Sequence, residues 1–101
     1  MYFYLGPISP NAEPHITVHP ESVTLPYGSL LSLCCDGVGE PKPNFQWLKD
    51  EQEIPGATDH ELVISPVLQD HQGTYTCRLF NDAGTANSRS AKVCINLGTD
   101  L

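Results

Sequence analysis

Four cysteines and four histidines are the side chains of this sequence that could carry chemistry. A cysteine nucleophile needs a histidine within hydrogen-bond reach and a third group that orients the histidine ring. A structural zinc site needs cysteine and histidine ligands at close spacing, but no Cys-x-x-Cys pair occurs. A disulfide needs only two cysteines that the fold brings together. The strands that hold Cys34, Cys35, Cys77 and Cys94 therefore decide which chemistry is open to the chain.

The histidines do not favour a catalytic or metal site. His15 and His19 fall on one expected edge strand, where residues four apart lie about 13 Å from each other at ~3.3 Å per residue. His60 falls in an expected loop and His71 at an expected corner. The expected strand order places none of them beside an exposed cysteine. We therefore expect no enzymatic activity, no metal and no cofactor.

Apolar alternation places two of the cysteines on inward strand faces. The residues that share a face are Leu31, Leu33 and Cys35, then Phe45 and Trp47, then Tyr75, Cys77 and Leu79. If these faces pack together, the Cys35 and Cys77 sulfurs meet across two layers with the Trp47 indole beside them. A disulfide there would close a loop of about 43 residues and stabilise the fold by about 4 kcal/mol. The spacing leaves the redox state of the pair open.

Composition and charge point to one small all-β domain that binds neither nucleic acid nor membranes. Nine prolines and eight glycines fall mainly between the apolar alternations, as turn residues do between short strands. The net charge of −7, from 12 acidic and 5 basic residues, repels phosphate backbones and anionic lipid headgroups. The apolar start, residues 1–6, has no basic flank and is too short for a signal-peptide core or a membrane span.

The alternation predicts strands over residues 15–19, 22–25, 30–36, 44–49, 62–64, 74–81 and 86–96. On the first of them, an edge strand, Ile16 and Val18 are expected to share one face. Residues 37–43 are expected to form a bend and residues 66–73 a corner. We expect one domain over residues 15–97, a linker or appended chain end over 1–14, and a C-terminal linker over 98–101.

The pattern resembles the I-set branch of the immunoglobulin family. The residues that carry this resemblance are Gly28, Leu31, Leu33, Cys35, Gly37, Gly39, Pro41, Trp47, Leu62, Ile64, Val67 and the run Gly73-Thr74-Tyr75-Thr76-Cys77. The resemblance implies a two-sheet Greek-key sandwich with Cys35, Cys77, Trp47, Tyr75 and Leu33 at its centre. It also implies a domain that binds partners and performs no catalysis. His71 departs from the family, which usually has aspartate there, so the contact made at this corner is an open question.

Shorter runs resemble the first immunoglobulin domain of the paracaspase family. These runs are Ile16 to Ser22, Leu33-Cys34-Cys35, Phe45 to Lys49, Glu53-Ile54-Pro55 and Val93-Cys94. The resemblance implies a module of an intracellular signalling scaffold that engages a caspase-recruitment adaptor and helps assemble the NF-kappaB activation complex. The protease would lie elsewhere in such a protein. The alternative is an extracellular adhesion or receptor domain with a Cys35–Cys77 disulfide.

The other two cysteines favour a reducing compartment. Cys34 and Cys94 are out of phase with the core residues beside them, so each should point outward, one on each sheet. Two outward thiols are ordinary in a reducing space and awkward in an oxidising one, and no Asn-x-Ser/Thr glycosylation site occurs. We therefore expect a cytoplasmic protein, with an extracellular one as the alternative.

One sheet face is the candidate partner surface. Its members point outward from the strands that hold Trp47, Cys77 and Cys94, and they are Gln46, Leu48, Arg78, Phe80 and Cys94. Exposed Leu48 and Phe80 with Arg78 between them would have the aromatic and arginine character of contact sites. The expected partners are a neighbouring immunoglobulin domain, a caspase-recruitment adaptor or a second copy of the chain.

Overall fold

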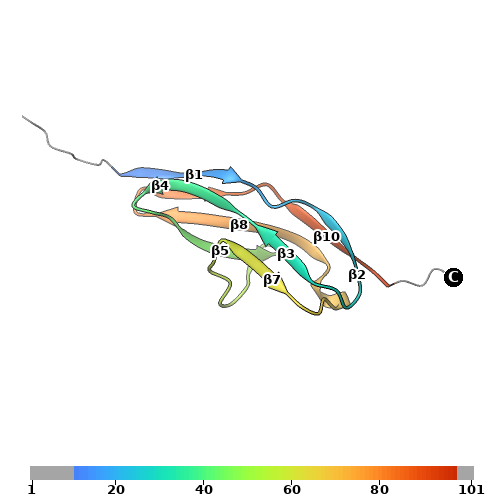
Figure 1. The fold of residues 1–101 in the computed structure, drawn as a ribbon. Helices are drawn as coiled ribbons and strands as arrows, with labels where there is room; N and C mark the ends of the chain where they lie inside the picture. The colour runs from blue at the N-terminus through green and yellow to red at the C-terminus, as the bar shows by residue number, and fades with distance from the viewer. Residues whose placement is uncertain (1–10, 98–101) are drawn as a thin grey trace, which may run out of the picture.

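A computed structural model of the chain describes residues 11–97 as two packed layers of β-strands (Figure 1). The expected linkers at 1–10 and 98–101 lie outside the described residues. The strands are β1 (Ala12–Val18), β2 (Val23–Pro26), β3 (Leu31–Cys34), β4 (Asp36–Glu40), β5 (Asn44–Lys49), β6 (Gln52–Glu53), β7 (Glu61–Ile64), β8 (Gly73–Asn81), β9 (Gly84–Asn87) and β10 (Ala91–Asn96). A single 3₁₀ turn, η1 (Gln69–His71), precedes β8.

The larger layer has the strand order β2-β10-β8-β5-β6. β9 pairs with the C-terminal part of β8, along the same edge that β10 occupies at the start of β8. The second layer consists of the pairs β1–β4 and β3–β7. Only Cys35 separates β3 from β4, so these two pairs are successive stretches of one layer. All strand pairs are antiparallel except β2–β10, which is parallel. The predicted all-β sandwich is confirmed.

The core lies between the layers and centres on Trp47, Tyr75 and Leu79, none of which is exposed. Burial of such large side chains is the main favourable term in folding. The indole N–H of Trp47 donates a 2.8 Å hydrogen bond to the Asp59 carbonyl oxygen, so the polar atom of this side chain is satisfied. Leu33 contributes from the second layer and is 3% exposed.

The expected bend over residues 37–43 is wrong, because residues 36–40 form strand β4. Gly37 makes this strand possible. A β-carbon at Gly37 would lie 2.5 Å from the His15 carbonyl oxygen and 2.5 Å from Leu79 Cδ2. Without a side chain, β4 comes close enough to β1 to pair with it, from Ala12 opposite Glu40 to Val18 opposite Asp36.

Three other strand expectations need correction. β1 begins at Ala12, so residues 12–14 belong to a strand and not to a linker. A register shift separates Ile16, which is 9% exposed, from Val18, which is 47% exposed, so the expectation that the two share one face is wrong. The final strand is divided at Ser88, whose hydroxyl accepts the Cys77 N–H at 2.9 Å and whose N–H donates to the Cys77 carbonyl oxygen at 2.8 Å. The two-residue strand β6 was not predicted.

The corner before β8 is closed by two hydrogen bonds. The Tyr75 hydroxyl donates to the His71 carbonyl oxygen at 2.5 Å, which is the tyrosine-corner arrangement. The Leu68 N–H donates to His71 Nδ1 at 2.8 Å, so the imidazole supplies an acceptor at the position where the family usually has aspartate. Nδ1 accepts only when it carries no proton.

Burial raises the pKa of Tyr75 to about 12, and the Asp50 carboxylate adds to the shift. The unfolded chain ionises this phenol near its ordinary pKa of 10.0. The folded state favours the neutral phenol, so the stability gained from it is fully present below that value. It is lost as the pH rises through about 12.

We predict that Tyr75→Phe lowers the free energy of unfolding by about 1–2 kcal/mol at neutral pH, because the His71 carbonyl oxygen loses its donor. Urea titration followed by tryptophan fluorescence measures the change. Tyr27→Phe is the matched control, since Tyr27 is 53% exposed. The difference between wild type and Tyr75→Phe should shrink as the pH rises above 10.0. A difference that is constant with pH would contradict the assigned role of the buried phenol.

Candidate functional site

Cys35 and Cys77 meet at the centre of the sandwich and join its two layers. They are 1% and 0% exposed, and all four cysteines of the chain are free thiols in the structure. The neighbouring Cys35 thiol and burial raise the pKa of Cys77. Both thiols are buried among core side chains, which is the environment of a structural cysteine pair.

Two of the histidine side chains, His19 and His71, accept backbone N–H groups. His19 Nδ1 accepts the Arg89 N–H at 3.0 Å, which ties the β1–β2 crossover to the start of β10. His60 Nδ1 lies 2.9 Å from an Asp59 carboxylate oxygen, and both side chains are exposed. Within residues 11–97 no group of three histidine, cysteine, aspartate or glutamate side chains is arranged to hold a metal ion.

An ion pair between β8 and β6 lies across the outer face of β5. Gln46 lies opposite Arg78, and Leu48 lies opposite Thr76. Arg78 Nη1 lies 2.9 Å from Glu53 Oε2, and β5 runs between the strands that carry these two residues. The ion pair therefore passes over the outer face of β5. Gln46 is also engaged, since its Nε2 donates to the Trp47 and Ile54 carbonyl oxygens at 2.9 Å each.

Leu48 is 6% exposed, so the expectation that it is an exposed contact residue is wrong. Alternation correctly places it on the outer face, but β6 and the Arg78–Glu53 ion pair bring other groups of the same chain over that face. Phe80, at 36% exposure, and half-buried Cys94 remain accessible there.

Four of the eight exposed large apolar side chains among residues 11–97 lie on the opposite layer, where no contact surface was predicted. Its large apolar side chains are Val18, Leu30, Val38 and Val63, exposed by 47%, 54%, 58% and 51%. Cys34 is exposed on the same layer. Leu30 and Cys34 alternate with inward Leu31 and Leu33, so the doublet Leu30-Leu31 was the signal for an apolar residue on the outer side.

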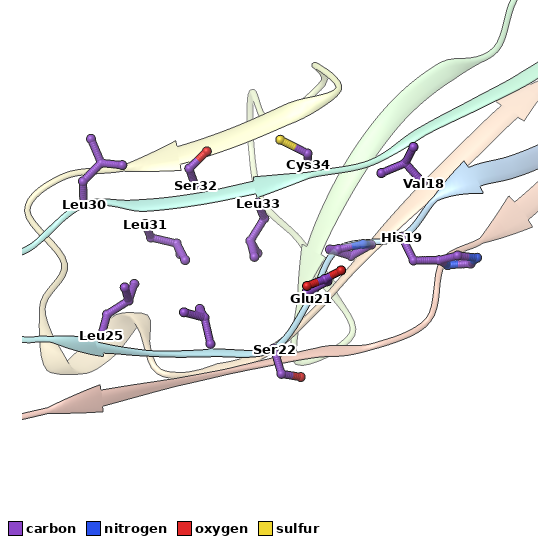
Figure 2. Close-up of a pocket in the computed structure, with 12 residues that line it drawn as sticks. Val18, His19, Glu21, Ser22, Leu25, Leu30, Leu31, Ser32, Leu33 and Cys34 are labelled. Carbon is purple, nitrogen blue, oxygen red and sulfur yellow. The ribbon is translucent and has the colours of Figure 1, made fainter.

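An open groove of about 490 Å³ lies beside this layer, between β2 and β3. Figure 2 shows Leu25 of β2 and Leu31 and Leu33 of β3 pointing into the gap between the two strands. Leu30 and Cys34 point away from the gap. No helix among the described residues is long and apolar enough to cross a membrane.

We predict that Leu48→Asp lowers the free energy of unfolding by about 2–4 kcal/mol, because it buries a carboxylate beneath an existing ion pair. Phe80→Asp is the matched control on the same face and should change this free energy by less than about 1 kcal/mol. Urea titration of both variants tests the assignment. Equal losses would mean that the two side chains are buried alike.

The sequence model described as immunoglobulin domain matches residues 13–81, which is more than half of the chain. The chain is 39% identical over 80 residues to the Mus musculus mucosa-associated lymphoid tissue lymphoma translocation protein 1 homolog, covering 79% of this chain and 10% of that protein. It is 33% identical over 98 residues to neural cell adhesion molecule L1 of Takifugu rubripes, covering 82% and 8%. The chain thus spans about a tenth of the length of these curated relatives.

Solved structures agree with the fold. The tandem Ig repeats of Dlar align with a TM-score of 0.82 at 26% identity, covering 87% of this chain and 50% of that one. A chain of the titin M10–obscurin-like 1 Ig complex aligns with a TM-score of 0.76 at 29% identity, covering 85% and 96%. With the two-layer fold, the central thiols beside a tryptophan and the tyrosine corner, these matches show that the chain belongs to the immunoglobulin domain family.

Proposed function

We propose that this domain is a non-catalytic protein-interaction module of an intracellular signalling scaffold of the paracaspase type, acting in assembly of the NF-kappaB activation complex. The observation that carries the proposal is the 39% identity over 80 residues to the Mus musculus mucosa-associated lymphoid tissue lymphoma translocation protein 1 homolog. Immunoglobulin sandwiches support many functions, so the fold alone would not select this one. The proposed partners are a neighbouring immunoglobulin domain and a caspase-recruitment adaptor.

The distribution of thiols supports an intracellular site of action. Cys34 is exposed and Cys94 is half-buried, and they lie on strands of different layers, so they do not protect each other by pairing. Exposed thiols oxidise or cross-link in secreted proteins but persist where glutathione keeps cysteines reduced.

The second candidate is an extracellular adhesion or receptor domain. It is favoured by the contact between Cys35 and Cys77, since the same pair could be oxidised to a disulfide. Neural cell adhesion molecule L1 and Drosophila melanogaster contactin, at 33% and 35% identity, are relatives whose names fit this candidate.

Four of the five proposed contact residues on the β5–β8–β10 face stay in the proposal. They are Gln46, Arg78, Phe80 and Cys94. Self-association is the weakest of the proposed partnerships, because two copies that each carry a net charge of −7 repel. The contact of Phe80 with a partner is tested by the Phe80→Asp variant, which should lose affinity for an adaptor while it keeps wild-type stability.

We predict that the fully reduced domain unfolds cooperatively in urea with a free energy of at least about 5 kcal/mol, within the range of ordinary native domains. Reduced protein is compared with protein in which an oxidant has linked Cys35 and Cys77. Cys34→Ser and Cys94→Ser substitutions in both samples prevent other disulfides. A reduced form that is largely unfolded would mean that the fold depends on the bridge and would support the extracellular candidate.

A further inference from the structure

The second layer has an empty strand position. β1 pairs with β4 as far as Val18, opposite Asp36, and the chain then crosses to the other layer, where β2 pairs with β10. β3 continues the line of β4 and pairs with β7 on one edge only. Among residues 11–97 no strand pairs with its other edge. A strand added at this edge would extend the line of β1.

The backbone of β3 has hydrogen-bonding groups directed to that edge. The Cys35 N–H donates to the His60 carbonyl oxygen at 2.9 Å, and the Ser29 carbonyl oxygen accepts the Val67 N–H at 2.8 Å, both on the β7 side. Successive residues of a strand direct their backbone groups to opposite sides. The N–H and C=O groups of Ser32 and Cys34 therefore point to the empty position. Exposed strand edges of this kind bind extended peptides.

The groove between β2 and β3 would receive the inward side chains of an added strand. Its apolar lining residues are Val18, Val23, Leu25, Leu30, Leu31 and Leu33. An antiparallel strand beside β3 would place an inward side chain next to half-buried Leu25, which faces the gap in Figure 2, at the rim of the core that buries Leu31 and Leu33. The side chains that flank it would lie next to outward Leu30, Ser32 and Cys34.

The charges around this edge are negative. Glu21 is the one carboxylate among the lining residues, and no lysine or arginine lines the groove; Arg89 lines an adjoining hollow. On the outer side of β3, Glu61 accepts a 2.7 Å hydrogen bond from the Ser32 hydroxyl. These carboxylates and the net charge of −7 attract a basic segment and repel a second copy of the chain.

We propose that the free edge of β3 binds an extended peptide of the partner protein, antiparallel to β3, with aliphatic residues at alternate positions and lysine or arginine at its ends. This assignment rests on the proposed function, since it names the kind of partner segment that such a module captures. It adds a peptide-binding edge on the layer opposite the proposed β5–β8–β10 contact face.

The test uses a blocked synthetic heptapeptide, Lys-Thr-Val-Thr-Val-Thr-Lys, titrated to millimolar concentration into the isotope-labelled domain and followed by NMR. Chemical shifts of the Ser32 and Cys34 amides should change, and these amides should become protected from hydrogen exchange. The same peptide with glutamate at both ends should bind at least about tenfold more weakly. Added salt should reduce this difference.

Two variants separate the local charge from the net charge. Glu21→Lys should weaken binding of the lysine peptide at least about threefold, because the carboxylate in the groove is replaced by an ammonium group. Asp82→Lys makes the same change in net charge on the exposed β8–β9 turn, whose Asn81 side chain bonds to Ala12 at the far end of β1, and should leave the affinity unchanged within error.

Absence of binding, or equal binding of both peptides, would overturn the proposal. Shift changes that instead gather around Arg78 and Phe80 would overturn it and leave the proposed interaction module intact. Shifts of Ser32 and Cys34 that depend on protein concentration without peptide would mean that a second copy occupies the edge. The stability of the reduced domain tests the proposed function independently of all these outcomes.

Discussion

The contact between Cys35 of one layer and Cys77 of the other, with Trp47 beside it, is the interaction on which the rest of the structure depends. It fixes how the two layers face each other. Neighbouring segments supply hydrogen-bond partners for the polar groups around it. Ser88 bonds both backbone groups of Cys77, and Asp59 accepts the indole N–H. No buried side-chain nitrogen or oxygen atom of the described residues lacks a hydrogen-bond partner.

The same packing decides which surfaces are left for partners. The larger layer covers its own outer face, because the Arg78–Glu53 ion pair spans β5 and Leu48 lies beneath it. The second layer loses a strand where β1 crosses over at His19 and Pro20, which leaves the edge of β3 unpaired and Leu30 exposed. Because the core supplies most of the stability, the fold tolerates an unpaired strand edge. Unpaired backbone groups at such an edge can pair with a strand of another chain.

The core could be predicted from the sequence, because it depends on alternation and on the identity of large side chains. Trp47, Tyr75 and the two inner cysteines all follow a period of two. The errors arise where another segment decides the outcome. The strand over 36–40 forms because Gly37 has no side chain that would keep β1 at a distance. Leu48 is buried by groups from β6 and β8. The empty edge of β3 depends on where β1 leaves its layer, which no local pattern around β3 records. The role of His71 as a backbone acceptor likewise needed the folded corner.

We propose that the two layers are joined through a pair of thiols in an intracellular binding module. The most direct measurement is the number of free cysteines in the protein isolated from the cells that make it, alkylated on denaturation without reductant and counted by mass spectrometry. The account predicts that all four cysteines of this domain are alkylated. Alkylation of Cys34 and Cys94 alone, with Cys35 and Cys77 linked to each other, would contradict it and identify an extracellular domain.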